Sequence, residues 1–208
     1  MSDKKLDHIQ RESEAEMPTK WGTFRMIAYN NQPYEMPHLA LMHGTFSPGD
    51  PVLVRIHSEC MTGDVFGSAR CDCGEQLDTA LQRVALNGGV VVYLRQEGRG
   101  IGLVNKLKAY NLQDEGFNTV DANLKLGFES DSRRFDIAIC ILKDLGISHV
   151  RLMTNNPEKI AAFDTDEIEF VERVPLEIAP NHKNRFYLQT KRDEMGHLLT
   201  LPVNGHQL

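Results

Sequence analysis

Residues 74–113 read GEQLDTALQRVALNGGVVVYLRQEGRGIGLVNKLKAYNLQ, and this stretch predicts the fold class. Apolar residues recur at helical spacing over Gly74–Asn87, and the following glycine pair is expected to end that helix. Val90–Leu94 is a continuous apolar run, which is typical of a strand buried on both faces. The turn RQEGRGIG then leads into a second helix, through about Gln113. This alternation of helix, strand and helix predicts a mixed α/β domain.

The flanking segments extend the same pattern. Upstream, WGTFRMIAY (21–29), HLALMHGTF (38–46) and PVLVRIHS (51–58) are expected to be strands separated by turns. Downstream, we expect a loop over 116–132, a helix over Arg134–Leu145, a strand over His149–Met153, a short helix capped by Asn156 with Pro157 at its first position, a strand over Ile168–Val174, and an amphipathic helix over Asn184–Leu199. The prediction is therefore one domain over 18–199, with a mixed β-sheet and flanking helices. Residues 1–17 are polar and are expected to be frayed or loosely attached, and residues 200–208 form an unassigned tail.

Composition narrows the class of protein. The 208 residues carry a net charge of −6, and 41% of them are hydrophobic, which is ordinary for a globular domain. The negative charge argues against a general nucleic-acid or membrane-surface binder, so any phosphate site must be a local basic cluster. The N-terminal stretch lacks the apolar run of a signal peptide, and no stretch approaches the roughly 18 apolar residues of a membrane helix. We therefore expect a cytoplasmic protein in which thiols act as ligands rather than as disulfides.

Three of the four cysteines lie within the stretch RIHSECMTGDVFGSARCDCGEQ (55–76), in the pattern C-x10-C-x-C. They are Cys60, Cys71 and Cys73. Three protein ligands with one open position are typical of a catalytic zinc site, whereas structural zinc sites have four ligands. The spacing also allows a structural site completed by His57 or Asp64, or thiols without a metal. Cys140 lies within the apolar pattern of FDIAICILKDL and is expected to be part of the core.

Each of the further motifs can be explained either by a structural role or by a role in ligand binding. The glycines of RQEGRGIG suit an anion at a helix start, but the spacing matches neither standard nucleotide-binding motif, and a plain tight turn fits as well. Asp131 and Arg133 stand at the start of a predicted helix, where Asp131 or Ser132 would serve as an ordinary N-cap. Tyr110 fits a core aromatic residue. Lys159 falls in a first helical turn, which is unfavourable for the helix dipole and hints at an anionic partner.

Together, these motifs resemble GTP cyclohydrolase II, the enzyme that opens riboflavin biosynthesis. The matching strings run from about Pro18 to Leu199: RIHSECMTGDVFGSARCDCGEQL, RQEGRGIGLVNKLKAYNLQDEGFNTVDAN, LGFESDSRRF, TNNPEK, VERVPL and YLQTKRDEMGHLL. The combination is far more specific than any one string. Many members of this family are fused to a dihydroxybutanone-phosphate synthase, for which 208 residues leave no room.

The resemblance implies a site, a reaction and partners. It implies Zn²⁺ held by Cys60, Cys71 and Cys73, Mg²⁺ at the triphosphate, and a homodimer. GTP contacts map onto Arg55, Ile56, His57, Ser58, Glu59, Gln76, Glu97, Gly98, Arg99, Thr119, Thr154 and Lys159. Tyr110 maps to an active-site tyrosine, Asp131 to a proton acceptor and Arg133 to a nucleophile. The implied products are formate, pyrophosphate and 2,5-diamino-6-ribosylamino-4(3H)-pyrimidinone 5′-phosphate.

Physical chemistry qualifies two of these implications. Three thiolates give a bound Zn²⁺ a formal charge of −1, which we expect nearby arginines to offset. A guanidinium cation is a poor nucleophile, so we expect Arg133 to stabilise phosphate charge while water attacks. Two alternatives to the full reaction stay open: a homologue that opens the ring but retains the formyl group, and a zinc-stabilised GTP-binding regulator without turnover.

Overall fold

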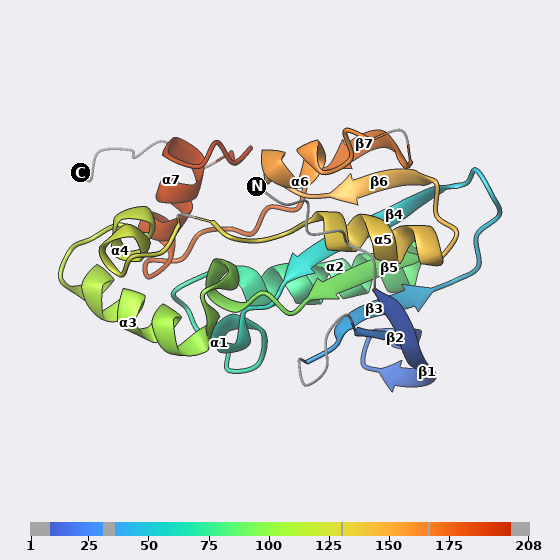
Figure 1. Ribbon diagram of the computed structural model, residues 1–208, viewed down its shortest axis with the longest axis horizontal. Helices are drawn as coiled ribbons and strands as arrows, with labels where there is room; N and C mark the ends of the chain where they lie inside the picture. Colours follow the sequence, from blue (N-terminus) through green and yellow to red (C-terminus); the bar gives the residue numbers. More distant parts are fainter. Residues whose placement is uncertain (1–8, 31–35, 130, 166, 201–208) are drawn as a thin grey trace.

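The computed structural model describes residues 9–30, 36–129, 131–165 and 167–200, which form a seven-stranded sheet flanked by helices (Figure 1). The strands are β1 (Gln10–Thr19), β2 (Gly22–Asn30), β3 (His38–His43), β4 (Pro51–Ser58), β5 (Gly89–Leu94), β6 (His149–Met153) and β7 (Glu169–Val174). The helices are α1 (Met61–Asp64), α2 (Cys73–Asn87), the 3₁₀ turn η1 (Glu97–Gly100), α3 (Gly102–Asp114), α4 (Thr119–Lys125), α5 (Asp136–Asp144), α6 (Pro157–Ala161) and α7 (Arg185–Asp193). Within these described ranges, no helix combines the length and the apolar character that a membrane crossing requires.

The sheet has an antiparallel half and a parallel half. Its strand order is β1-β2-β3-β5-β4-β6-β7. The pairs from β1 to β5 are antiparallel, whereas β4 pairs in parallel with β5 and β6, and β6 pairs in parallel with β7. The parallel strands therefore end at one common edge. In open α/β sheets, ligands bind outside the carboxyl ends of the strands, so this edge is where a site is expected.

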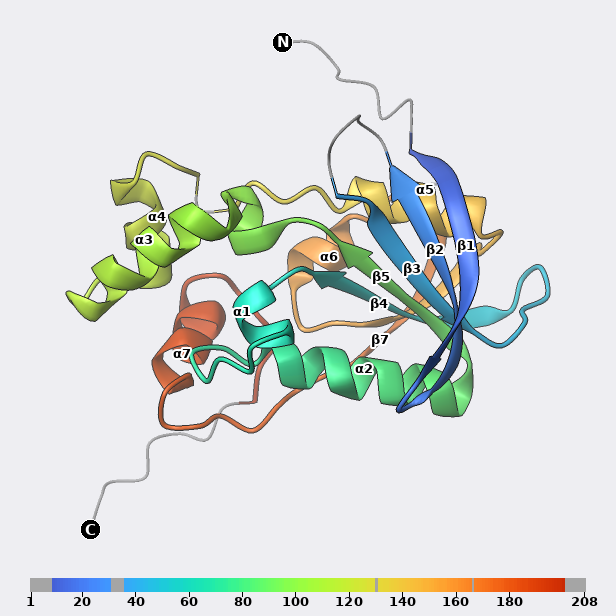
Figure 2. The same ribbon diagram turned by 90° about the horizontal axis from the view of Figure 1, so that it is seen from below.

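Alternation along the central strands builds two hydrophobic layers. Val52, Val54 and Ile56 pack with the apolar side of α5 on one face of the sheet. Leu53 and the apolar side of α2 form the second layer on the other face. Figures 1 and 2 show α5 and α2 on opposite sides of the sheet. The mixed α/β class predicted from the sequence is confirmed.

Most of the predicted strands and helices are present, but the N-terminal segment differs from expectation. Residues 10–17, which we expected to be frayed, belong to β1 and pair with β2 along its length. Almost every β1 side chain is exposed, so a polar sequence can form this strand without burying its charges. Arg11 donates to Asp144 of α5 at 2.7 Å, and the Tyr29 hydroxyl donates to the same carboxylate at 2.7 Å. Residues 1–8 of the predicted flexible segment lie outside the described residues.

Three smaller expectations also need correction. The segment 116–132, expected to be a loop, contains α4, whose N-cap Asn118 accepts a hydrogen bond from the Asp121 amide. The C-terminal helix ends at Asp193 rather than Leu199, and Gly196 follows with a positive φ of 63° that a continuing helix does not allow. Cys140 is half-buried rather than part of the core. Residues 201–208 of the predicted tail lie outside the described residues.

Candidate metal and anion site

A cavity opens at the carboxyl edge of the parallel strands. It encloses about 1160 Å³, including space continuous with solvent, and its lining comes from segments far apart in the sequence. The ends of β4, β5 and β6 lead into it, and α1, α3, α4 and α7 lie beyond that edge (Figure 2). A cavity with several convergent polar groups suits a small-molecule ligand.

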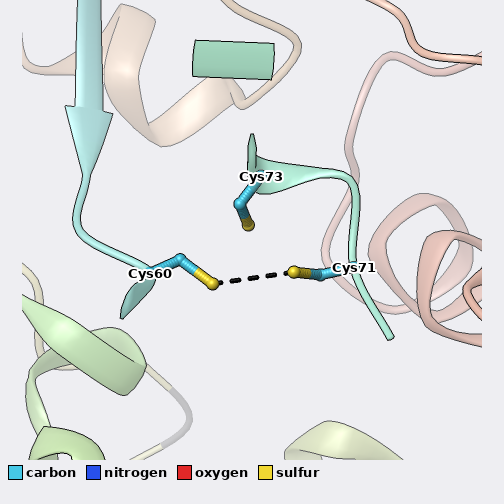
Figure 3. Close-up of side chains that lie close together, drawn as sticks. All are labelled: Cys60, Cys71 and Cys73. Carbon is cyan, nitrogen blue, oxygen red and sulfur yellow. Dashed lines mark hydrogen bonds between the residues drawn. The ribbon is translucent and has the colours of Figure 1, made fainter. Parts of the chain in front are cut away.

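Three thiols of the cavity lining converge on one another. The sulfurs of Cys60, Cys71 and Cys73 all lie within 4.8 Å of one another, and the Cys60 and Cys71 sulfurs are 3.6 Å apart. Figure 3 shows the three side chains pointing toward a common centre. Cys60 follows β4, whereas Cys71 and Cys73 lie at the start of α2. Two sulfurs bound to a tetrahedral zinc ion at about 2.3 Å lie roughly 3.8 Å apart, so the cluster fits such an ion.

Gly63 explains how the thiols can approach so closely. A Cβ at this position would lie 3.0 Å from the Cys71 sulfur, 3.2 Å from the Cys60 sulfur and 3.2 Å from the Cys73 Cβ. The missing side chain therefore leaves the space that the cluster occupies. Of the described residues, only these three cysteines form a group with metal-ligand spacing. The chemistry and the packing of this donor set both fit a three-thiolate metal site with an open position.

His57 and Asp64, considered above as a fourth ligand, are engaged elsewhere. The His57 Nε2 lies 3.1 Å from both Asp64 oxygens, and since a carboxylate only accepts, this nitrogen carries the proton. Asp64 also accepts from the Tyr93 hydroxyl at 2.9 Å and from the Cys60 amide at 2.9 Å. Asp64 thus fixes the backbone at one of the three cysteines. Burial lowers the pKa of His57, which favours the neutral ring.

Lys106 supplies a positive charge to the thiol cluster. Its ammonium group donates to the Cys60 sulfur at 3.1 Å and to Glu97 at 2.8 Å. Glu97 in turn accepts from the Met61 amide at 2.6 Å, which holds the segment after Cys60. Burial opposes the charged form, but the Cys60 charge and the Glu97 bond outweigh it, and the pKa of Lys106 is raised. We expected arginines in this role, but the cation that touches a sulfur is a lysine.

A hydrogen-bonded chain runs from the cysteine loop into the sheet. Asp72, between two of the cysteines, accepts from the Gln76 side-chain amide. The Gln76 oxygen accepts from Arg55 at 2.5 Å, and Arg55 also donates to the Met153 carbonyl at 2.9 Å. Burial lowers the pKa of Arg55 to about 10, so it remains a cation at neutral pH. The chain therefore fixes a buried positive charge beside the thiol cluster.

Lys159 is a second buried basic side chain at this edge. It is 5% exposed, and its ammonium group donates to the Ile56 carbonyl at 2.8 Å. Among the described residues, no carboxylate forms an ion pair with it. Burial, followed by the charges of Arg55 and Arg133, lowers the pKa of Lys159 well below its usual value. A buried ammonium group with only a carbonyl partner is costly unless an anion joins it.

Asp131 and Arg133 form a bidentate ion pair. The Arg133 guanidinium donates through Nε at 2.8 Å and also through Nη2 to the Asp131 carboxylate. Burial opposes both charges, but the pair outweighs it: the pKa of Asp131 is lowered and that of Arg133 is raised. Arg133 is therefore held in its charged form. The predicted helix cap does not explain this geometry, because α5 begins only at Asp136.

Tyr110 lies near the thiol cluster rather than in the core. Its hydroxyl is 3.4 Å from the Thr62 hydroxyl, and the Arg70 guanidinium lies 5.0 Å from the centre of its ring. Burial raises the pKa of Tyr110, so the phenol is protonated at neutral pH. The residue can therefore donate a hydrogen bond or a proton into the cavity.

The cavity gathers nearly all the residues that the resemblance singles out. Ile56 and Asp131 do not line it: Ile56 is fully buried, and Asp131 acts through Arg133. The other predicted side chains line it, including Thr119, Thr154 and Lys159 from three separate segments. Sequence reasoning missed five charged or aromatic residues of the lining, which are Asp72, Lys106, Tyr187, Lys191 and His197. Asp72 had a signal because it stands between two cysteines, and the other four lie within strings that match the family, although the resemblance assigned them no role.

The chain is similar to known proteins over most of its length. The sequence pattern of the family described as GTP cyclohydrolase II matches residues 10–175. Riboflavin biosynthesis protein RibBA of Bacillus cereus strain AH187 is 57% identical over 194 residues, which cover 93% of this chain and 49% of that protein. RibBA of Chlorobium phaeovibrioides is 55% identical over 193 residues, covering 92% and 47%. The chain thus spans about half the length of these relatives.

Among solved structures, one partial alignment is at low sequence identity. It is with the crystal structure of RibBX, a two domain 3,4-dihydroxy-2-butanone 4-phosphate synthase from A. baumannii. The alignment has 18% identity and a TM-score of 0.44, and it covers 81% of this chain and 40% of that one.

Proposed function

The chain belongs to the GTP cyclohydrolase II family, and from that premise we propose that it hydrolyses GTP to formate, pyrophosphate and 2,5-diamino-6-ribosylamino-4(3H)-pyrimidinone 5′-phosphate. The observation that carries this proposal is the presence of two centres in one cavity. A three-thiol cluster and the buried basic side chains of Arg55, Arg133 and Lys159 line the same cavity. A reaction on the base and the triphosphate of one nucleotide needs a centre that activates water for the base and a centre that binds the phosphates.

The proposal assigns Zn²⁺ to the three cysteines. Bound there, the ion would supply a Lewis acid and an activated water for the two hydrolytic steps at the base. Lys106 offsets the net negative charge of three thiolates through its hydrogen bond to the Cys60 sulfur. Tyr110, kept protonated by burial, donates a proton from its hydroxyl to the ring nitrogen that leaves as the C–N bond breaks.

The proposal assigns the triphosphate, with Mg²⁺, to the buried cations. Positive groups held in fixed, largely buried positions stabilise the charge that develops during phosphoryl transfer. Arg133 stabilises charge on the α-phosphate, and water attacks. The bidentate bond to Asp131 supports this assignment, because it keeps the guanidinium charged and its lone pairs unavailable for attack.

One assay separates this function from its alternatives. The protein is incubated with GTP, Mg²⁺ and Zn²⁺ under reducing conditions, and formate and pyrophosphate are measured together. Equal amounts of both products are expected. Pyrophosphate without formate would favour the homologue that retains the formyl group, and the absence of both products would favour a GTP-binding regulator. The homodimer that the resemblance implies is tested separately by light scattering.

A further inference from the structure

A segment that follows residues 10–175, the part of the chain matched by the family model, borders the cavity. The match ends at residue 175, yet Tyr187, Lys191 and His197 line the cavity alongside the residues discussed above. Figures 1 and 2 both place α7 beyond the carboxyl edge of the sheet, on the side of α4 and far from β1. The Leu198 amide donates to the Asn155 carbonyl at 2.8 Å, which ties the segment to the end of β6. The C-terminal segment thus forms part of the cavity lining and is held in place by a hydrogen bond to the segment after β6.

Lys191 carries a buried charge into this lining. Its side chain is 12% exposed, and its ammonium group lies 3.1 Å from Asp72 Oδ1 and 4.3 Å from the centre of the Tyr187 ring. The other Asp72 oxygen accepts from Gln76. Burial opposes the charge on Lys191, but Asp72 outweighs it and the pKa of Lys191 is raised. Lys191 is therefore a cation at neutral pH.

His197 presents an open hydrogen-bonding position at the same place. Its Nε2 is buried and has no hydrogen-bond partner among the described residues. Lys191, Arg133 and Lys159 face the ring from α7, from the segment before α5 and from α6, and Arg99 faces it from η1. The surrounding positive charges disfavour the binding of a further cation at this imidazole nitrogen. It can instead donate an N–H to an oxyanion, for which the neutral ring suffices.

The charge balance favours an anionic ligand here. Arg55, Arg133 and Lys191 are three largely buried cations, and Lys159 adds a buried amine that bonds to no carboxylate among the described residues. The carboxylates that bond to the three cations directly or through Gln76 are two, Asp72 and Asp131. An uncompensated excess of buried positive charge is unfavourable until a multiply charged anion arrives. A diphosphate or triphosphate group would bring the negative charge and the acceptor oxygens that these buried basic groups can bind.

We propose that Lys191 and His197 bind the phosphate groups of the substrate directly, so that the C-terminal segment completes the polyphosphate site. This inference rests on the proposed function. The competing explanation is that Lys191 only neutralises Asp72 and thereby positions Gln76 and Arg55. In that case its loss would affect every part of the ligand that those two residues contact, rather than the phosphates alone.

Binding of two probes distinguishes these roles. Inorganic pyrophosphate with Mg²⁺ and guanosine are each titrated calorimetrically into the zinc-loaded wild type, Lys191→Met and His197→Ala. Loss of a charge-assisted hydrogen bond should weaken pyrophosphate binding roughly ten- to hundredfold while guanosine binding stays unchanged. Lys191→Arg and His197→Gln should each recover part of the loss. Arg192→Met is the matched control, because Arg192 is its sequence neighbour and pairs with Asp193 instead.

A double variant addresses the counterion role. If Lys191 only neutralises Asp72, then Asp72→Asn combined with Lys191→Met should restore pyrophosphate affinity. Our proposal predicts that affinity stays low in this double variant. Restored affinity, unchanged pyrophosphate binding in both single variants, or equal losses for both probes would overturn the inference. If the wild type binds neither pyrophosphate nor GTP, the proposed function is contradicted as well. If the wild type binds normally, a negative result in the variants contradicts only the roles of Lys191 and His197.

Discussion

Gly63 offers a sharp test of the metal assignment, because replacing it with alanine presses directly on the thiol cluster. The new Cβ would lie 3.0 Å from the Cys71 sulfur and 3.2 Å from the Cys60 sulfur. Comfortable contacts between heavy atoms begin near about 3.5 Å, so the sulfurs must withdraw by several tenths of an ångström. Metal–ligand distances tolerate only about 0.2 Å. Overpacking of this kind costs about 1–3 kcal/mol, which corresponds to zinc binding weakened roughly five- to 150-fold.

The assay is competition for Zn²⁺ with a chromophoric chelator under reducing conditions, alongside thermal unfolding of the metal-free protein. Gly67→Ala is the control in the same loop. Gly67 has a positive φ of 62°, but nothing lies within 4 Å of its added Cβ, so that variant strains the backbone without touching the sulfurs. Zinc affinity should fall in Gly63→Ala and not in Gly67→Ala. Wild-type affinity in a folded Gly63→Ala protein would refute a metal site packed against this glycine.

Three further predictions follow from the contacts. Lys106→Met should shift the sulfur-to-metal charge-transfer band of the Co²⁺-substituted protein to longer wavelength, because the Cys60 sulfur loses a charge-assisted bond; Lys108→Met on the same helix should leave the band in place. No guanylyl adduct should be trapped on the protein by mass spectrometry; an adduct that Arg133→Ala abolishes would show that Arg133 is a nucleophile. A chain beginning at Pro18 lacks most of β1 and should melt lower by about 2–4 °C for each kcal/mol lost, whereas an unchanged melting temperature would mean that the strand contributes nothing.

The sequence specified the central layers of the fold because their patterns are strong. Val90–Leu94 is apolar throughout and lies in the middle of the sheet, where no alternative to a buried strand competes. β1 gave no such signal. Its exposed side chains carry no alternation of burial, and its strand conformation depends on antiparallel pairing with β2, which begins at Gly22 directly after the turn that follows Thr19. The short helix α4 was missed for a related reason, since only two of its seven residues, Ala122 and Asn123, are buried.

The site divides in the same way. Residue type and spacing predict the cluster of Cys60, Cys71 and Cys73, and the structure brings the three thiols together. Lys106 and Lys191 do not, because a lysine on a helix is usually solvated and only the tertiary fold turns these two inward. The distance from Lys191 to its partner spans 119 residues of sequence, which no local pattern can reveal.

The central claim is that one cavity holds two separable centres, a thiolate metal site for the base and a cation cluster for the phosphates. The most direct test is the ratio of formate to pyrophosphate released from GTP by Cys71→Ser, with circular dichroism establishing that the variant is folded. Because the cation cluster does not include Cys71, formate release should be lost while measurable pyrophosphate release remains. Loss of both products in the folded variant, or retention of both in equal amounts, would contradict the two-centre account.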